Sequence, residues 1–397
     1  MSQFSKRYYI FLIVFLGMLS AFGPFVTDMY LPTLPTMAEV FHTTASLVQM
    51  GLATSMLGLA IGQVFFGPLS DKYGRKSVLI AAMVLFALST VASIYSPSIE
   101  FFNVCRFLQG LGGSGGIVLS RSVATDCYSG RELGKTLAII GAINGIAPVT
   151  APVIGGLVSE AVGWKGIFWI LFGFGAVILA MCLVFQESHA KEKRYTGSVL
   201  SLLKGFSKIF KLRFFVIYTL LYAFCCGVLF SYVSSASFII QNHFGFSELQ
   251  FSIVFGINAL GIGFGSGLSL KFKKMSDAAL VGALGIVGSA ILQWIVYVAL
   301  PGFILYEILT FLMLVSVGFI LTSATTLAMN EGRAMVGTAS AIFGASGFLF
   351  GGIVSPLVGI GNILSTTLIL LSICGCSALL FAWMSWRRTG NNSELAN

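Results

Sequence analysis

The chain has 397 residues, of which 57% are hydrophobic and only 9% are charged, and its mean hydropathy is +0.94. Soluble domains carry about 25% charged residues, so this composition excludes a soluble globular protein and indicates an integral membrane protein. The net charge of +9 would suit a nucleic-acid partner only if the cations gathered on one exposed surface.

Twelve apolar segments are long enough to span a bilayer, which takes about 20 residues in a helix. We therefore expect an all-α polytopic membrane protein with two pseudo-symmetric bundles of six helices each. The bundles are residues 1–186 and 213–397, the second with a short cytoplasmic tail, and a basic cytoplasmic linker, 187–212, joins them. The segments lie near 8–30, 46–66, 77–95, 99–124, 135–158, 164–185, 213–235, 248–270, 277–299, 302–326, 335–358 and 364–386.

The distribution of lysine and arginine predicts the orientation of the chain. With the N-terminus inside, all but two of the 23 cations fall on or beside cytoplasmic loops, as the positive-inside rule requires. The two exceptions are Lys165 and Arg106. Both termini are therefore expected in the cytoplasm. The basicity then reflects topology, so we expect a lipid bilayer and no nucleic acid as partner.

The first segment carries a buried acid. Gly17, Ala21, Pro24 and Asp28 follow at intervals of four, three and four, which places them on one face of a helix. We expect Gly23 and Pro24 to kink this helix. An ionisable residue inside a membrane span is costly and suggests a proton or substrate site; the alternative for Asp28 is an interfacial capping acid.

Residues 67–76, Gly-Pro-Leu-Ser-Asp-Lys-Tyr-Gly-Arg-Lys, form a charged turn between two apolar segments. Glycines permit close helix approach and turn geometry, and the aspartate offsets part of the basic cluster. A generic positive-inside loop would explain the cations but not the full spacing. The residues singled out here are Gly67, Asp71, Gly74, Arg75 and Lys76.

The segment 99–124 places Arg106 and Gln109 on one face together with two glycines. An arginine at mid-helix costs about 2.5–3.5 kcal/mol even on the insertion scale unless it meets an acid or water. Counting at about 1.5 Å per residue, Asp28 and Arg106 lie at similar depth and are candidate partners, either for proton coupling or as a structural ion pair. Residues 110–115 also spell G-x-G-x-x-G, but a dinucleotide site needs a βαβ unit, so we expect close helix packing instead.

The segment 135–158 carries a stripe of glycine and proline at intervals of four, three, four and three. Such a stripe suits a surface on which helices bend or slide. Its members, with the glycine that follows, are Gly141, Gly145, Pro148, Pro152, Gly155 and Gly156.

In the C-terminal half, Glu307 is the only acid inside an apolar segment, either a second protonatable group or an interfacial residue. Aromatic residues such as Phe230 and Tyr232 could line a cavity, although they are usually packing. The residues that we assign to a substrate cavity are Tyr30, Gln109, Asn144, Tyr222, Asn258 and Glu307. The seven cysteines lie in or at the ends of apolar helices without metal-knuckle spacing, so no metal site is expected.

The charged turn resembles the G-x-L-(A/S)-D-(R/K)-x-G-R-(R/K) loop of the major facilitator superfamily. Residues 106–113 resemble the R-x-x-Q-G-x-G motif of proton-coupled members, and 147–156 resemble the antiporter motif of bicyclomycin and chloramphenicol exporters. Ala151 replaces the motif's glycine before Pro152, and Pro148 is an addition. With Asp28-Met-Tyr-Leu-Pro32, these motifs make the chain similar to the twelve-helix drug:proton antiporters of the bicyclomycin-resistance (Bcr/CflA) type.

The resemblance implies a transporter rather than an enzyme. This transporter would lie in the plasma (inner) membrane of a bacterial cell and export small amphipathic molecules such as drugs or antibiotics in exchange for protons. Two bundles would alternate access to a midplane cavity, Asp28 would carry the proton, and Arg106 would tune its charge state. Asp126 would join Asp71 and Arg75 in a charge cluster that latches the cytoplasmic side. No cofactor is expected besides the coupling proton, and the protein would function as a monomer.

Three alternatives stay open. A proton-coupled exporter of a specific metabolite or sugar would share the fold and differ only in its cavity lining. An importer is disfavoured by the antiporter-like segment 135–158. A non-transporting membrane enzyme or receptor would need a metal or nucleophile constellation, or a sizeable soluble domain, and the sequence has neither.

Overall fold

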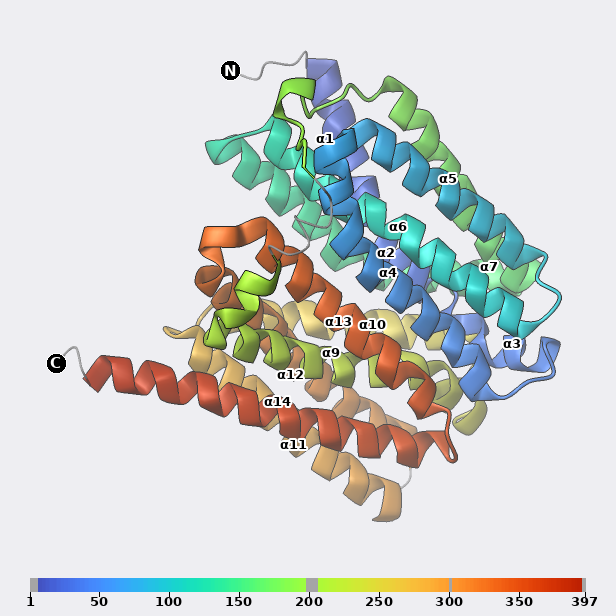
Figure 1. Cartoon of the computed structure of the whole chain (residues 1–397). Helices are drawn as coiled ribbons and strands as arrows, with labels where there is room; N and C mark the ends of the chain where they lie inside the picture. Colours follow the sequence, from blue (N-terminus) through green and yellow to red (C-terminus); the bar gives the residue numbers. More distant parts are fainter. Residues whose placement is uncertain (1–5, 198–205, 300–301, 395–397) are drawn as a thin grey trace. The chain divides into compact units, whose positions relative to one another are not determined.

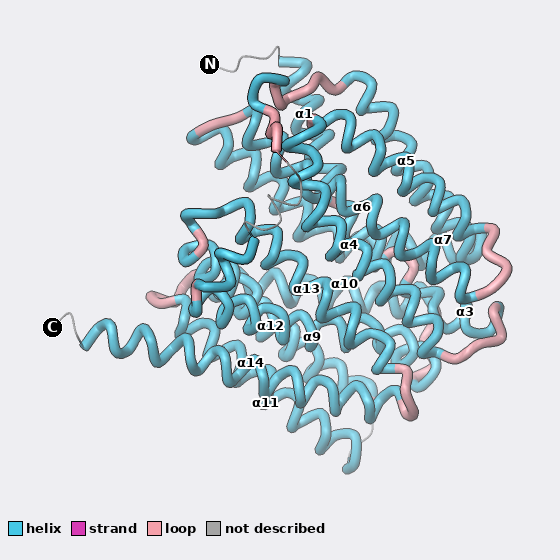
Figure 2. The backbone as a smooth tube through the Cα atoms, in the orientation of Figure 1, coloured by secondary structure: helices cyan, strands magenta, loops and turns pink. Residues whose placement is uncertain are grey.

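The computed structural model describes residues 6–197, 206–299 and 302–394, and within these ranges the chain forms helices and connecting loops without a strand (Figure 2). The N-terminal half contains α1 (Lys6–Ser20), α2 (Phe22–Asp28), η1 (Leu31–Thr33), α3 (Leu34–Val40), α4 (Ala45–Tyr73), α5 (Arg75–Ile94), α6 (Ile99–Cys127) and α7 (Gly130–Val184). The linker contains η2 (Lys191–Lys193) and η3 (Phe206–Lys211). The C-terminal half contains α9 (Arg213–Ser237), η4 (Phe238–His243), α10 (Glu248–Ser269), α11 (Met275–Ala299), α12 (Phe303–Glu331), η5 (Arg333–Met335), α13 (Val336–Val358) and α14 (Ile363–Glu394) (Figure 1).

The chain divides into two compact units. The N-terminal unit is Met1–Thr43 with Thr54–Leu203, and the C-terminal unit is Thr44–Ala53 with Lys204–Asn397. The first turns of α4 belong to the C-terminal unit, where their side chains form hydrogen bonds. Ser46 donates to the carbonyl of Pro356, and Gln49 donates to the carbonyl of Ser234, each at 3.0 Å. The predicted linker 187–212 is shared between the two units.

The predicted membrane spans all lie on helices. In the described part of the chain, ten helical segments are long and apolar enough to cross a membrane. One of them, on α7, runs through two predicted spans, and Gly163 separates these with a φ of 71° and a ψ of −178°. The predicted span 99–124 is α6, which is 29 residues long. It is not among the ten segments, and it carries Arg106 and several glycines. The prediction of an all-α fold with twelve spans is confirmed.

The glycines of α6 allow close packing in the N-terminal unit, as predicted. A Cβ on Gly110 would collide with the backbone of Ser55 on α4, and one on Gly112 would lie 2.6 Å from the backbone nitrogen of Phe86 on α5. Figure 1 shows α5 alongside α6, and α5 also packs on α7. Because backbones meet at these points, a side chain would force the helices apart.

The break between α1 and α2 has a local cause. Pro24 has no backbone N–H, so the carbonyl of Ser20 loses its helical partner. The helix is interrupted at Ala21, and α2 then ends at Asp28. The kink predicted from Gly23-Pro24 is therefore present, and it leaves Asp28 at the end of a short helix.

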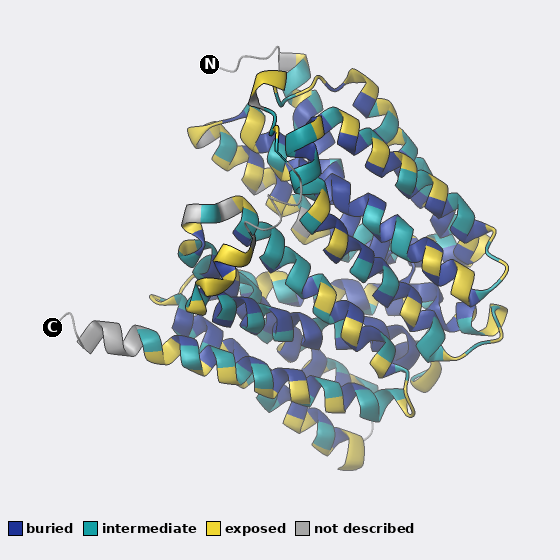
Figure 3. Ribbon diagram, in the orientation of Figure 1, coloured by how far each residue is buried: buried dark blue, intermediate teal, exposed yellow. Residues whose placement is uncertain are grey.

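In the C-terminal unit, α9 packs against α12, α13 and α14, while α11 packs against α12 and α14. The faces turned away from these contacts are apolar. On α11 they include Val281, Leu284, Ile291, Ile295 and Val298, each at least 46% exposed, and Figure 3 shows exposed positions recurring along α11 and α14. Helices with apolar outer faces are stable in a bilayer, where their backbone bonds are satisfied internally.

Candidate functional site

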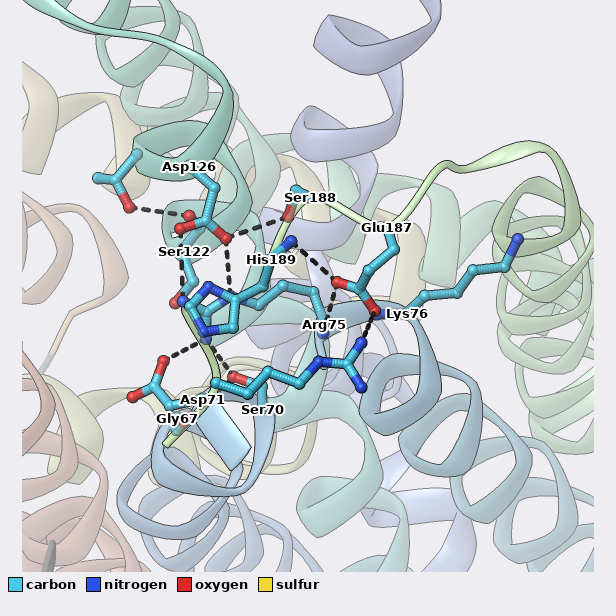
Figure 4. A network of polar contacts seen from close by, with 12 residues as sticks. Gly67, Ser70, Asp71, Arg75, Lys76, Ser122, Asp126, Glu187, Ser188 and His189 are labelled. Atoms are coloured by element: carbon cyan, nitrogen blue, oxygen red, sulfur yellow. Dashed lines mark hydrogen bonds and ion pairs between the residues drawn. The ribbon is translucent and has the colours of Figure 1, made fainter. Parts of the chain in front are cut away.

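The predicted charge cluster of the 67–76 turn is formed in the N-terminal unit (Figure 4). Arg75, whose side chain is 7% exposed, donates to Asp126 at 2.8 Å and to Asp71 and Ser70 at 2.6 Å each. These contacts join the end of α4, the start of α5 and the end of α6. A guanidinium holds several oxygens at once because its donors lie in a fixed plane, so Arg75 fixes the mutual orientation of the three helices at this end of the unit.

The start of the linker completes this cluster, which the sequence did not predict. Glu187 accepts hydrogen bonds from the backbone nitrogens of Arg75 at 2.9 Å and Lys76 at 3.2 Å. These are the first two residues of α5, so the Glu187 carboxylate caps that helix from 112 positions away along the chain. A carboxylate at a helix N-terminus satisfies free N–H groups and is stabilised by the helix dipole.

Further contacts tie the linker segment 186–197 to the same place. Arg194 pairs with Glu187 at 3.3 Å, and the backbone nitrogen of Tyr195 donates to the carbonyl of Asp71 at 3.0 Å. Lys76 donates to the carbonyl of Phe185 at 2.7 Å. Gly74 precedes α5 with a φ of 97°, and a Cβ there would collide with Arg194. Glycine is therefore favoured at this position by its backbone angle, while the Arg194 side chain could shift to make room for a Cβ.

Asp28 is buried, with 7% of the residue exposed, at the end of α2. Its one hydrogen-bond donor among the described residues is the Thr27 hydroxyl, at 2.7 Å. Thr27 also donates to the carbonyl of Gly23 at 2.9 Å, so its single proton is shared between two acceptors. Asp28 is thus a carboxyl group inside a membrane segment without a cation beside it.

Arg106 is completely buried and is held by neutral groups. It donates to Gln109 on its own helix, to the carbonyl of Val26 at 2.6 Å and to the Ser55 hydroxyl at 3.3 Å. Its guanidinium also lies over the Tyr30 ring, 4.2 Å from the ring centre. A cation over an aromatic face gains about 2 kcal/mol when it is desolvated.

The predicted contact between Asp28 and Arg106 is absent from the ion pairs of the described residues. The depth estimate placed both near one level, but it could not give their rotation about the helix axes. Arg106 reaches the backbone of Val26, two residues before Asp28, and its two terminal nitrogens also donate to Ser55 and Gln109. Arg106 on α6 thus contacts α2 near Asp28 without forming an ion pair with it.

The stripe on α7 has two different environments. Gly141 and Gly145 have open space where a Cβ would stand, whereas a Cβ on Gly155 would collide with the carbonyl of Met29, the residue after Asp28. Pro148 and Pro152 lie within the helix, and Gly156 is buried. Within the N-terminal unit, close packing is therefore confined to the Gly155 end of the stripe, where α7 meets the turn that holds Asp28.

The structure divides the predicted cavity residues between two clusters. In the N-terminal unit, Tyr30 and Gln109 surround Arg106, and Gln109 also donates to Thr90 at 2.7 Å. In the C-terminal unit, Asn258 donates to Glu307 at 2.5 Å and to the Tyr232 hydroxyl at 2.8 Å.

Of the other two predicted cavity residues, Tyr222 lies outside these clusters. Tyr222 stacks on Phe343 with ring centres 4.0 Å apart, which is a packing contact of α9 with α13. Asn144 is on α7, but its side chain lies outside the described residues.

The C-terminal unit also contains a small hollow of about 80 Å³ between η4, α11, α12 and α14. Its lining is mainly aromatic and aliphatic, and the Oε1 atom of the buried Gln293 has no hydrogen-bond partner there. Its lining residues are His243, Phe244, Gln293, Val296, Tyr297, Gly302, Tyr306, Leu364 and Leu368. Tyr306 directly precedes Glu307 on α12.

Apolar outer faces, paired helical units and charged groups buried within the spans define a multi-pass membrane transporter. A sequence model of the Major Facilitator Superfamily matches residues 10–356, and the chain belongs to that family. It is accordingly a transporter rather than an enzyme.

Individual relatives agree with this assignment. The chain is 37% identical to the uncharacterized MFS-type transporter YdgK of Bacillus subtilis, over 95% of this chain and 96% of the relative. It is 30% identical to the bicyclomycin resistance protein homolog of Haemophilus influenzae, over 89% of each. The fold resembles the xylose transporter XylE from E. coli with a TM-score of 0.75 at 17% identity, over 96% of this chain and 98% of XylE. The two relatives agree with membership of the family, and the likeness to XylE concerns the fold alone.

Proposed function

We propose that this protein exports small amphipathic molecules, drugs or antibiotics among them, across the bacterial plasma membrane in exchange for protons. The observation that carries the proposal is Asp28, a carboxyl group buried in a membrane segment with a single shared hydroxyl donor. A charge in such a place is costly and serves a proton or substrate path more often than structure. The name of the Haemophilus relative supports an antibiotic as substrate.

The cycle would proceed by alternating access, in which the two helical units expose the binding site first to one side of the membrane and then to the other. Asp28 would take up a proton from outside and release it inside, in the orientation with both termini cytoplasmic. Arg106 lies near the same turn and would influence the charge state of Asp28 when the helices move. Each proton moved inward yields about 2.3 kcal/mol per 100 mV of membrane potential, which can drive export. The proposal needs no cofactor and no second copy of the chain.

The test uses purified protein in liposomes with an imposed pH gradient. The compounds are a small panel of lipophilic cations and neutral antibiotics, including bicyclomycin and chloramphenicol. Wild type is compared with Asp28→Asn and with Glu39→Gln, a matched control in which an exposed acid of α3 is neutralised.

Accumulation driven by the pH gradient in wild type and Glu39→Gln, with its loss in Asp28→Asn, would support the proposal. Coupled export by Asp28→Asn would refute the role of Asp28. If no compound moves and none releases protons, a narrow metabolite or sugar becomes the better substrate. Uptake of a compound together with protons would instead identify an importer.

A further inference from the structure

The cluster of Tyr232, Asn258 and Glu307 in the C-terminal unit contains two buried oxygens that lack a donor. Glu307 is the fifth residue of α12, and its Oε1 atom accepts from Asn258. Its Oε2 atom is buried without a hydrogen-bond partner, and so is the Oδ1 atom of Asn258. Asn258 is completely buried and Tyr232 is 3% exposed. The amide nitrogen of Asn258 therefore donates to two acceptors. The amide oxygen and the second carboxyl oxygen of Glu307 receive no hydrogen bond.

No cation compensates the carboxyl group of Glu307 among the described residues. In the described part of the C-terminal unit, Glu331 forms an ion pair with Arg388 near the other end of α12, and Glu307 forms none. The titratable groups that face Glu307 are the phenols of Tyr232 on α9 and Tyr306 on α12, while α10 contributes the amide of Asn258. All of these neighbours are neutral donors or acceptors.

One proton would resolve both deficits. A proton bound to Oε2 removes the carboxylate charge and turns that oxygen into a donor. The Glu307 carboxyl group and the Asn258 amide are already joined by one hydrogen bond. A protonated Oε2 atom of Glu307 can donate a second one to the free Oδ1 atom of the same amide. Buried acceptors are costly when they are left without a hydrogen-bond donor, so the arrangement of the cluster favours binding of a proton.

We propose that Glu307 is a second proton-binding site, which Asn258 and Tyr232 position in the C-terminal unit. Among the described residues, each unit then carries one carboxyl group on a membrane helix without a cation beside it, the buried Asp28 in the first and the half-buried Glu307 in the second. The use of this proton in the transport cycle rests on the proposed function and gives two protons per exported molecule. Proton binding by Glu307 is independent of that function.

A structural role for Glu307 makes a different prediction for one variant. Glu307→Gln keeps an oxygen that accepts from Asn258 and supplies an N–H for the Oδ1 atom, so it mimics the protonated acid and should fold. If Glu307 only links α10 to α12, this variant should behave as wild type. If Glu307 binds a proton, the variant is fixed in the protonated state.

The first experiment requires no substrate. Full-length protein in liposomes is treated with dicyclohexylcarbodiimide, which modifies protonated carboxyl groups in apolar surroundings, over a series of pH values. Mass spectrometry then locates the label. We expect label on Glu307 that decreases as the pH rises along a one-proton titration, with no label at Glu39. Absence of label at Glu307, or label that does not change with pH, in a sample whose Asp28 is labelled would overturn the proposal.

The second experiment counts protons in liposomes for any compound that wild type exports. Glu307→Gln should lower the ratio of protons to substrate from two to one, whereas Asp28→Asn should abolish coupling. An unchanged ratio in Glu307→Gln would overturn the role of Glu307 in the cycle. If wild type exports nothing, the proposed function fails, and the labelling experiment still decides whether Glu307 binds a proton.

Discussion

The carboxylate that caps α5 from the linker gives a quantitative prediction. Glu187 accepts from the first two backbone nitrogens of α5 and pairs with Arg194, and both side chains are about a quarter exposed. Loss of a helix cap costs about 0.5–2 kcal/mol, and a partly exposed ion pair adds up to about 1 kcal/mol. We expect Glu187→Ala to destabilise the attachment of residues 186–197 by about 1–2 kcal/mol, while the transmembrane helices stay folded.

Hydrogen exchange measured by mass spectrometry is the suitable assay, because it reports local opening. A change of 1–2 kcal/mol corresponds to roughly 5- to 30-fold faster exchange in the linker segment and the first turn of α5. The matched control is Glu192→Ala, an exposed acid of η2 in the same segment. Equal exchange in the two variants, or faster exchange spread over all helices, would refute the assignment of Glu187 as the cap.

Three further outcomes are expected. Gly112→Ala should lower stability in detergent by about 1–3 kcal/mol, because its Cβ meets the α5 backbone. Gly134→Ala, which has open space at its Cβ, should not. Equal midpoints of thermal unfolding in the two variants would contradict the packing argument. Arg75→Lys should cost about 1–2 kcal/mol in the same assay, since one ammonium cannot hold Asp71 and Asp126 with a planar fork, and a wild-type midpoint would argue against this. Tyr232→Phe removes an acceptor of Asn258 at a cost of about 1 kcal/mol and should move the pH at which carbodiimide labels Glu307; an unmoved profile would remove Tyr232 from the site.

Much of the fold could be predicted because membrane helices are set by local apolar length. The kink before Asp28 follows from Pro24, and the close approach at Gly110 and Gly112 follows from small residues in series. The cluster of Asp71, Arg75 and Asp126 was expected from a family resemblance rather than from spacing, since Asp126 is 51 positions from Arg75.

The remaining site contacts depend on how helices rotate and where loops return, which no local pattern contains. Depth along the helices placed Asp28 near Arg106, yet the guanidinium bonds to Val26, Ser55 and Gln109 instead. Glu187 was overlooked within a basic linker. The available signal was its position directly after the last apolar span of the first half, where the chain returns to the charged turn.

The way Arg106 is satisfied has a consequence for how the protein enters the membrane. Its helix α6 is absent from the ten segments of the described chain that are long and apolar enough to cross a membrane, and an arginine adds about 2.5–3.5 kcal/mol to the insertion free energy. The hydrogen-bond acceptors of Arg106 lie at Val26, Ser55 and Gln109, which are synthesised earlier or within the same helix. We therefore expect α6 to leave the translocon only in association with the preceding helices, so that the order of synthesis supplies the acceptors at Val26 and Ser55 before the charge that needs them.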